Sequence, residues 1–246
     1  MAIFSISCRQ SLATSAAFSL LLLILGYSPL QAQAQFSACG DLENAFGPFD
    51  YLKESAAPEN KHNLNSPLYL VESTHFRPHM EALVPGINLL GQEFDYTLRA
   101  FPNHHRALNA IARLSEREKN GQPKGSRYTV DCWFDRAIRF RKDDIVVRML
   151  LASYLGNTQR NAEAMKQLEA ASKLAGDNGF SRYNVGMVYF DLKEYGLALE
   201  QAHAAMRLGM PRTGLRERLT AIGQWKEPQE STEAAVPESP TKSTSQ

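Results

Sequence analysis

Imidazole and carboxylate side chains gather in one part of the sequence, and they are the groups best suited to chemistry. Between residues 75 and 105 the chain has His75, His79, Glu81, His104 and His105. Two histidines four residues apart on one helix can bind the same zinc ion. Pro78 stands between His75 and His79, however, and proline belongs in the first turn of a helix, so His75 is expected to lie outside that helix. We therefore favour histidines that cap helices or face solvent and predict no metal ligands. A metal-binding or enzymatic role of this region is the alternative.

The usual sequence signatures of catalysis are missing from the chain. It has no HExxH, C-x-x-C or G-x-S-x-G motif and no serine or cysteine with an evident base. Gly121 and Gly125 flank a short polar stretch, but no lysine followed by serine or threonine continues it into a helix, as a phosphate-binding loop requires. We therefore predict that the protein is not an enzyme and uses no cofactor.

The segment 1–34 differs in composition from the rest of the chain. Arg9 is its only charged residue, residues 16–25 form an apolar run, and residues 32–34 supply small side chains for cleavage. This pattern is typical of a secretory signal peptide, residues 1–34, and predicts a periplasmic or secreted protein without membrane insertion after its removal. A membrane anchor is one alternative, but the run is shorter than the roughly 20 residues that span a bilayer. A lipoprotein is another, but Cys39 lies well beyond the run.

The charge of the remaining chain is balanced. Without Arg9, the acidic and basic side chains are equal in number. No positive field is available to attract phosphate backbones, so we predict no nucleic-acid partner.

The cysteines predict a covalent link. Three are encoded, and Cys8 would leave with the signal peptide. Cys39 and Cys132 would then reach an oxidising compartment, where two cysteines are the smallest set that can pair. We predict a disulfide that ties the N-terminal part of the chain to the helix carrying Trp133. Two separate thiols are the alternative, because the bond needs Cα atoms within roughly 7 Å.

Apolar and small residues recur at a constant spacing of about 34 residues, which we call the repeat step. The stretch from Gly179 to Pro211 predicts two helices, residues 181–192 and 195–208. Their inward residues are Val185, Gly186, Tyr189, Ala198, Ala202, Ala205 and Leu208. One step earlier the matching residues are Leu151, Ala152, Leu155, Ala164, Leu168, Ala171 and Leu174. A second step back from the alanine helix leads to Phe134, Ala137 and Phe140.

This pattern resembles the tetratricopeptide repeat (TPR) family, through Val185-Gly186-x-x-Tyr189, the alanines that follow and the closing Pro211. Arg182 stands where that family has a tryptophan. The resemblance implies an all-α solenoid of helix pairs over residues 87–225, and a plain helical bundle is the alternative.

The N-terminal segment has a weaker pattern. We expect residues 35–86 to form an irregular cap, in which Leu68–Ser73 is a short strand or an extended segment. Residues 87–101 predict a helix, Asn103 is the expected cap of the next one, and the polar loop 120–127 is expected to be mobile and to overhang a neighbouring face. The inward residues of the first of these helices are Leu90, Phe94, Thr97 and Leu98.

The C-terminal part predicts one more helix and a tail. Residues 213–225 should form a capping helix that buries Leu215, Leu219 and Ile222. Residues 226–246 are rich in proline, serine, threonine and glutamate without apolar periodicity, so we predict a disordered tail.

The TPR resemblance also implies a mode of binding, because in that family the first helices of the pairs line a concave groove for extended peptides or partner helices. The matching positions are Arg106, Asn109, Arg113, Arg117, Met149, Ser153, Asn157, Tyr183, Met187, Phe190 and Asp191. We therefore expect an exported scaffold for a protein or peptide partner, with Met187 and Phe190 contributing little to stability. An ordinary solvated face is the alternative, and the sequence leaves the oligomeric state open.

Overall fold

The computed structural model describes residues 39–86 and 89–228, and regular structure within them is helical. These residues form eleven α-helices and one short 3₁₀ helix and contain no strand, which confirms the predicted all-α class. The predicted signal peptide lies outside the described residues, as do residues 229–246 of the predicted tail. The elements are α2 (Tyr51–Ala56), η1 (Pro58–His62), α3 (Pro67–His75), α4 (Pro78–Glu81), α5 (Leu90–Ala100), α6 (His105–Glu118), α7 (Val130–Phe140), α8 (Ile145–Asn157), α9 (Asn161–Ala175), α10 (Gly179–Asp191), α11 (Tyr195–Arg207) and α12 (Gly214–Ala221).

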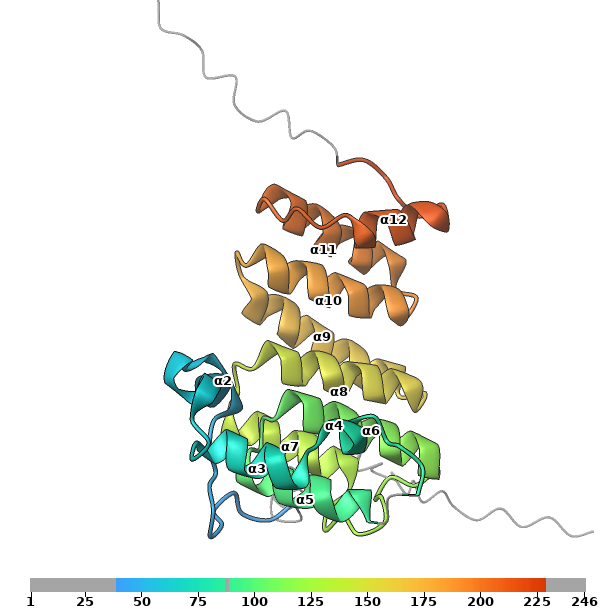
Figure 1. Cartoon of the computed structure of the whole chain (residues 1–246). Coiled ribbons are helices and arrows are strands. Elements are labelled where there is room, and N and C mark those ends of the chain that lie inside the picture. Colours follow the sequence, from blue (N-terminus) through green and yellow to red (C-terminus); the bar gives the residue numbers. More distant parts are fainter. Residues whose placement is uncertain (1–38, 87–88, 229–246) are drawn as a thin grey trace, which may run out of the picture.

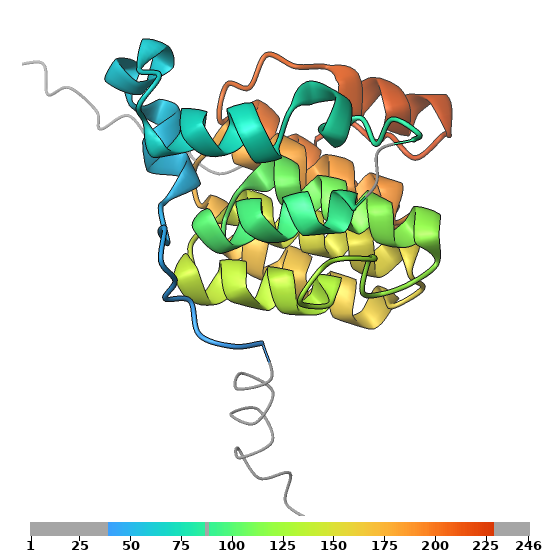
Figure 2. The ribbon, with the colours of Figure 1, turned by 60° about the horizontal axis from the view of Figure 1, so that its bottom comes forward.

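The helices are stacked along the molecule, from α5 at one end to α12 at the other (Figure 1). α8 packs against α9 and α10 against α11, while α6, α8, α10 and α12 contact one another in that order. The N-terminal helices lie along one side of the first part of the stack, where α3 contacts α5 and α4 contacts α6 (Figure 2). The N-terminal segment thus covers one side of the first helices, and α12 covers the far end of the stack.

The repeat step is present in the backbone as well as in the sequence. It separates the starts of α8 and α10, the ends of the same two helices, and the starts of α9 and α11. Asp144 caps α8 by accepting a backbone N–H three residues later, and Asn178 caps α10 in the same way. Gln159 and Lys193, each in the turn that follows the first helix, have left-handed φ angles of 64° and 66°. The two helix pairs therefore share caps and turns as well as apolar positions.

Small residues let the helices of a pair approach closely, as predicted. A Cβ atom on Gly186 would lie 2.5 Å from Leu215 Cδ2 and 3.0 Å from Gln201 Cβ, so glycine fits where a larger residue would not. The predicted inward residues of both pairs are buried except Leu174 and Leu208, which keep 40% and 41% of their surface exposed. The expectation for these two is wrong, because they lie at the ends of the second helices, where a side chain has fewer neighbours.

Leu68–Ser73, expected to be a strand or an extended segment, belongs to helix α3. The start signal is present in the sequence: Ser66 Oγ accepts a backbone N–H at 3.2 Å, and Pro67 occupies the first helical position. The helix buries Val71 to 1% exposure in a small cluster with Phe101. Packing against α5 therefore stabilises a helix where β-branched and aromatic residues had indicated a strand.

α6 is capped by His104 rather than by Asn103. The Asn103 side chain is buried and engaged elsewhere, since its Nδ2 donates to Asp50 Oδ1 at 2.9 Å and to Asp144 Oδ2 at 3.2 Å. Asn103 therefore joins the caps of α2 and α8 instead of capping its own helix.

The inward residues predicted outside the repeats are mostly confirmed. Leu215 and Leu219 of α12 are buried, whereas Ile222 follows the end of the helix and is 44% exposed, so that prediction is wrong. In α5 the confirmed inward residues are Leu90, Phe94, Thr97 and Leu98.

The predicted link between Cys39 and Cys132 is confirmed. The sulfur atoms lie 2.10 Å apart and the Cα atoms 5.0 Å apart. Two arginines of α7 donate to the backbone carbonyls of residues 39–41. Arg136 Nη1 lies 2.9 Å from the carbonyl oxygen of residue 39 and 2.6 Å from that of residue 41, and Arg139 Nη2 lies 2.9 Å from that of residue 40. The disulfide and these bonds together fix the N-terminal segment to α7.

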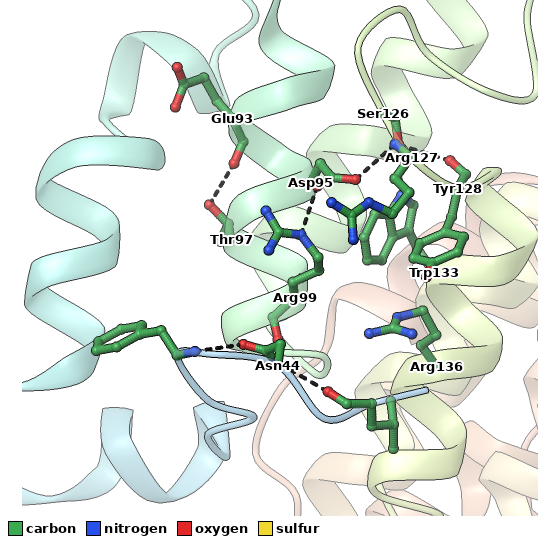
Figure 3. A network of polar contacts seen from close by, with 12 residues as sticks. Asn44, Glu93, Asp95, Thr97, Arg99, Ser126, Arg127, Tyr128, Trp133 and Arg136 are labelled. Atoms are coloured by element: carbon green, nitrogen blue, oxygen red, sulfur yellow. Dashed lines mark hydrogen bonds and ion pairs between the residues drawn. The ribbon is translucent and has the colours of Figure 1, made fainter. Parts of the chain in front are cut away.

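The loop between α6 and α7 is held against α5 (Figure 3). Asp95 Oδ1 of α5 accepts from the Arg127 backbone N–H at 2.8 Å, while Oδ2 accepts from Arg99 Nε at 2.8 Å. Within the loop, Ser126 Oγ accepts from Trp133 Nε1 at 2.9 Å. The loop therefore packs on α5 instead of overhanging a neighbouring face.

Candidate functional site

The residues predicted to bind a partner lie on three helices that are neighbours in the stack. α6 contacts α8, and α8 contacts α10, so residues on these helices form adjacent rows. We call this surface the α6–α8–α10 face. Its members are Arg106, Asn109, Arg113, Arg117, Met149, Ser153, Asn157, Tyr183, Met187, Phe190 and Asp191.

At the N-terminal end of the face, two arginines hold the N-terminal helices. Arg106 Nε donates to Glu81 Oε1 at 3.0 Å, and Arg106 Nη1 donates to Glu72 Oε1 at 3.2 Å. The hydrogen bond from Arg106 keeps the pKa of the Glu81 carboxyl below its usual value. Arg117 Nη1 donates to the Leu83 carbonyl at 2.6 Å. These two guanidiniums therefore secure α3, α4 and the turn after α4.

In the middle of the face the side chains are more accessible. Asn109 and Arg113 are exposed, and the positive charge of Arg113 contributes to the lowered pKa of the Glu81 carboxyl. Asn157 is also exposed, and its Nδ2 donates to Glu116 Oε1 at 2.9 Å, which links α8 to α6. Met149, in contrast, is only 9% exposed, so it belongs to the core.

At the C-terminal end of the face, α12 covers α10 through Arg218. Its Nη2 donates to Asp191 Oδ1 at 2.5 Å, its guanidinium carbon lies 4.2 Å from the centre of the Phe190 ring, and its Nη1 lies 3.8 Å from Met187 Sδ. Tyr183, Met187 and Phe190 are half-buried and pack against the main core. These contacts argue against the expectation that Met187 and Phe190 contribute little to stability, which was based on the spacing within α10 and could not include the contacts of α12.

Three of the four histidines that suggested a metal site, His75, His104 and His105, are each paired with a different carboxylate. His75 Nδ1 lies 2.7 Å from Glu93, and His105 Nε2 lies 2.9 Å from Asp144. Within the part of the chain that the structure describes, no three histidine, cysteine, aspartate or glutamate side chains are placed to share a metal ion. The individual pairs join neighbouring elements: α3 to α5, and α6 to the cap of α8.

His104 is a fully buried helix cap. Its Nδ1 accepts from the Ala107 backbone N–H at 3.2 Å, so the ring proton is on Nε2, which donates to Glu72 Oε1 at 3.0 Å. The ring packs against Tyr51, with centroids 4.2 Å apart, and is 0% exposed. Burial lowers the pKa of His104 below its usual value, and capping requires the neutral ring.

A cleft that the sequence had not indicated opens beside Arg106. It has a volume of about 630 Å³ and lies between α2, η1, α3 and the start of α6. We call it the N-terminal cleft. Residues that line it include Tyr51, Glu54, Pro58, Leu68, Tyr69, Glu72 and Arg106. It was missed because its walls belong to short helices in a segment expected to be irregular, although Ser66-Pro67 marks the start of one of them.

In the described part of the chain, no helix combines the length and apolar character needed to cross a bilayer. Comparison of the chain with protein-family models, curated proteins and solved structures finds no match.

Proposed function

We propose that this chain is an exported TPR-type solenoid that binds a protein or peptide partner across the α6–α8–α10 face. The observation that carries the proposal is the recurrence of caps, turns and buried residues at the repeat step in α8–α9 and α10–α11. Stacked repeats of this kind create extended surfaces that serve for binding.

The composition of residues 1–34 and the cysteine pair support export. An apolar run with one positive charge is typical of a secretory leader. The sulfur atoms of Cys39 and Cys132 lie at bonding distance, and such bonds persist in oxidising compartments. The location that we propose is therefore the periplasm or the outside of the cell.

The middle of the α6–α8–α10 face is the part best suited to contact the partner. Its ends are occupied, since Arg106 holds the N-terminal helices and Arg218 covers the residues of α10. Asn109, Arg113 and Asn157 are exposed between them and offer amide and guanidinium groups for hydrogen bonds. The arrangement suits an extended polypeptide with acceptor groups better than a small apolar ligand.

Site-specific photocrosslinking tests this proposal. A photoreactive amino acid is placed at Asn109 or Asn157, and the same amino acid is placed at Lys166 or Glu200, which are exposed on the second helices. In intact source cells we expect one discrete adduct from the first two positions only, and its loss when Arg113→Glu is added. Adducts of equal yield from all four positions, or none from Asn109 and Asn157, would contradict the proposal. Thermal melting of each variant confirms that it is folded.

A further inference from the structure

The N-terminal cleft continues the α6–α8–α10 face, because Arg106 belongs to both. Its walls are partly aromatic and apolar: Tyr51, Leu68 and Tyr69 line it, and the Tyr69 side chain is 44% exposed. A cleft of about 630 Å³ is large enough for one long side chain of a bound polypeptide. A polypeptide bound along the α6–α8–α10 face would therefore place a side chain in this cleft where it passes Arg106.

The charges around the cleft are unbalanced in favour of carboxylates. Arg106 is shared by Glu72 and Glu81, so one guanidinium faces two carboxylates. Glu54 accepts from Asn60 Nδ2 at 2.8 Å but forms no ion pair within the described residues. Glu81 lies outside the cleft, so the cleft lining itself carries two carboxylates, Glu54 and Glu72, against one guanidinium.

The His104 ring, which contacts Glu72 from the buried side, does not compensate for this excess. His104 donates to Glu72 from the buried side, but its cap bond to the Ala107 backbone N–H requires the neutral ring. A bound anion would therefore be repelled by the carboxylates, because the one guanidinium of the cleft, that of Arg106, is already paired with Glu72 and Glu81. An uncharged apolar group would remove water from Glu54 without replacing its hydrogen bonds, which is unfavourable.

We propose that the N-terminal cleft binds a lysine or arginine side chain of a polypeptide partner. The cationic group would pair with Glu54 beside the rings of Tyr51 and Tyr69, where carboxylate and aromatic faces both attract a cation. The aliphatic stem would lie along Leu68. This inference rests on the proposed function in one respect: the basic side chain belongs to the polypeptide that crosses the α6–α8–α10 face.

Titration of the exported chain with N-acetyl-lysine methylamide tests the proposal. With ¹⁵N-labelled protein, we expect saturable amide shift changes concentrated in residues 51–60 and 66–72. The same compound acetylated on its side-chain amine lacks the charge and should cause much smaller changes. Equal shift changes from both compounds, or changes centred elsewhere, would overturn the proposal.

Glu54→Gln is the informative variant, because glutamine keeps an oxygen that can accept from Asn60. We expect its dissociation constant for the lysine compound to rise roughly two- to fivefold, as loss of a cation's ionic partner at a partly exposed site predicts. Glu200→Gln, at an exposed position of α11, is the matched control and should bind like the unaltered protein. An unchanged dissociation constant for Glu54→Gln would contradict the proposal.

Failure of this inference and failure of the proposed function give different results. Photocrosslinking from Asn109 and Asn157 reports on the middle of the face and does not require the cleft. Retained adducts without lysine binding would reject the cleft proposal alone. Lysine binding without adducts would support a cation site and reject the α6–α8–α10 face as the partner surface.

Discussion

Arg148 and Arg182 occupy equivalent positions in successive helix pairs and make the same two bonds. Arg148 donates to Gln167 Oε1 of α9 at 3.2 Å and to the carbonyl six residues before itself at 2.9 Å. Arg182 donates to Gln201 Oε1 of α11 at 3.3 Å and to the carbonyl six residues before itself at 2.8 Å. In both pairs, a guanidinium thus bridges the first and second helices.

The Arg182–Gln201 bridge should contribute measurably to stability. We expect Arg182→Met and Gln201→Leu each to lower the free energy of unfolding by about 1–2 kcal/mol, since each leaves the other partner unsatisfied. Gln201 is 7% exposed, so water replaces the lost bond poorly. The double variant should lose less than the sum of the two. Urea unfolding of all four proteins measures this coupling, and simple additivity would show that the bridge has no energetic role.

Gly186→Ala should destabilise the last helix pair. The new Cβ would lie 2.5 Å from Leu215 Cδ2, so the buried Leu215 side chain must move, with an expected loss of about 1–3 kcal/mol in the free energy of unfolding. Gly196→Ala is the matched control, because no atom lies within 4 Å of its added Cβ. It should be neutral or stabilise α11 by up to about 1 kcal/mol. Equal effects of the two substitutions on the melting temperature would contradict this account.

Reduction of the Cys39–Cys132 bond should release the N-terminal segment. The cysteines are 93 residues apart, and loss of a native disulfide typically lowers the free energy of unfolding by about 2–5 kcal/mol. The urea midpoint should therefore fall when dithiothreitol is present. A variant with both cysteines replaced by serine should already have the lower midpoint and show no response to dithiothreitol. A midpoint that reductant leaves unchanged in the unaltered protein would show that the bond contributes nothing.

His104 should make stability depend on pH in the mildly acidic range. Burial lowers its pKa in the folded protein, whereas in the unfolded chain the pKa is about 6.5. Below pH 6.5 the unfolded state therefore binds a proton that the folded state does not, so stability falls as pH falls, by at most about 1.4 kcal/mol per pH unit. Above this pH the contribution is constant.

Urea unfolding between pH 7.5 and pH 5 measures this slope. His104→Asn keeps a side chain that can cap α6 but has no group that titrates in this range. The variant should be less stable at pH 7.5, because the ring contacts are lost, and its stability should fall less steeply with pH. An equal slope in both proteins would assign the pH dependence to other groups.

The sequence by itself determined the helical class, the phase of the repeat and the cysteine pair. Helical spacing and the repeat step identified Val185, Tyr189, Ala164 and their counterparts as core residues, because these signals depend on neighbours within one helix or one helix pair. Cys39 and Cys132 could be paired because no other cysteine remained once the predicted signal peptide was set aside.

The tertiary structure decided which polar and aromatic residues are free. Arg106 is held by α3 and α4, His104 caps α6 from a buried position, and Phe190 lies under Arg218 of α12. The N-terminal cleft likewise forms from short helices that meet only in the folded chain. The bonds of Arg106, the burial of His104 and the position of Phe190 under Arg218 have no period or short motif, because each depends on segments that are separated in sequence and brought together by packing.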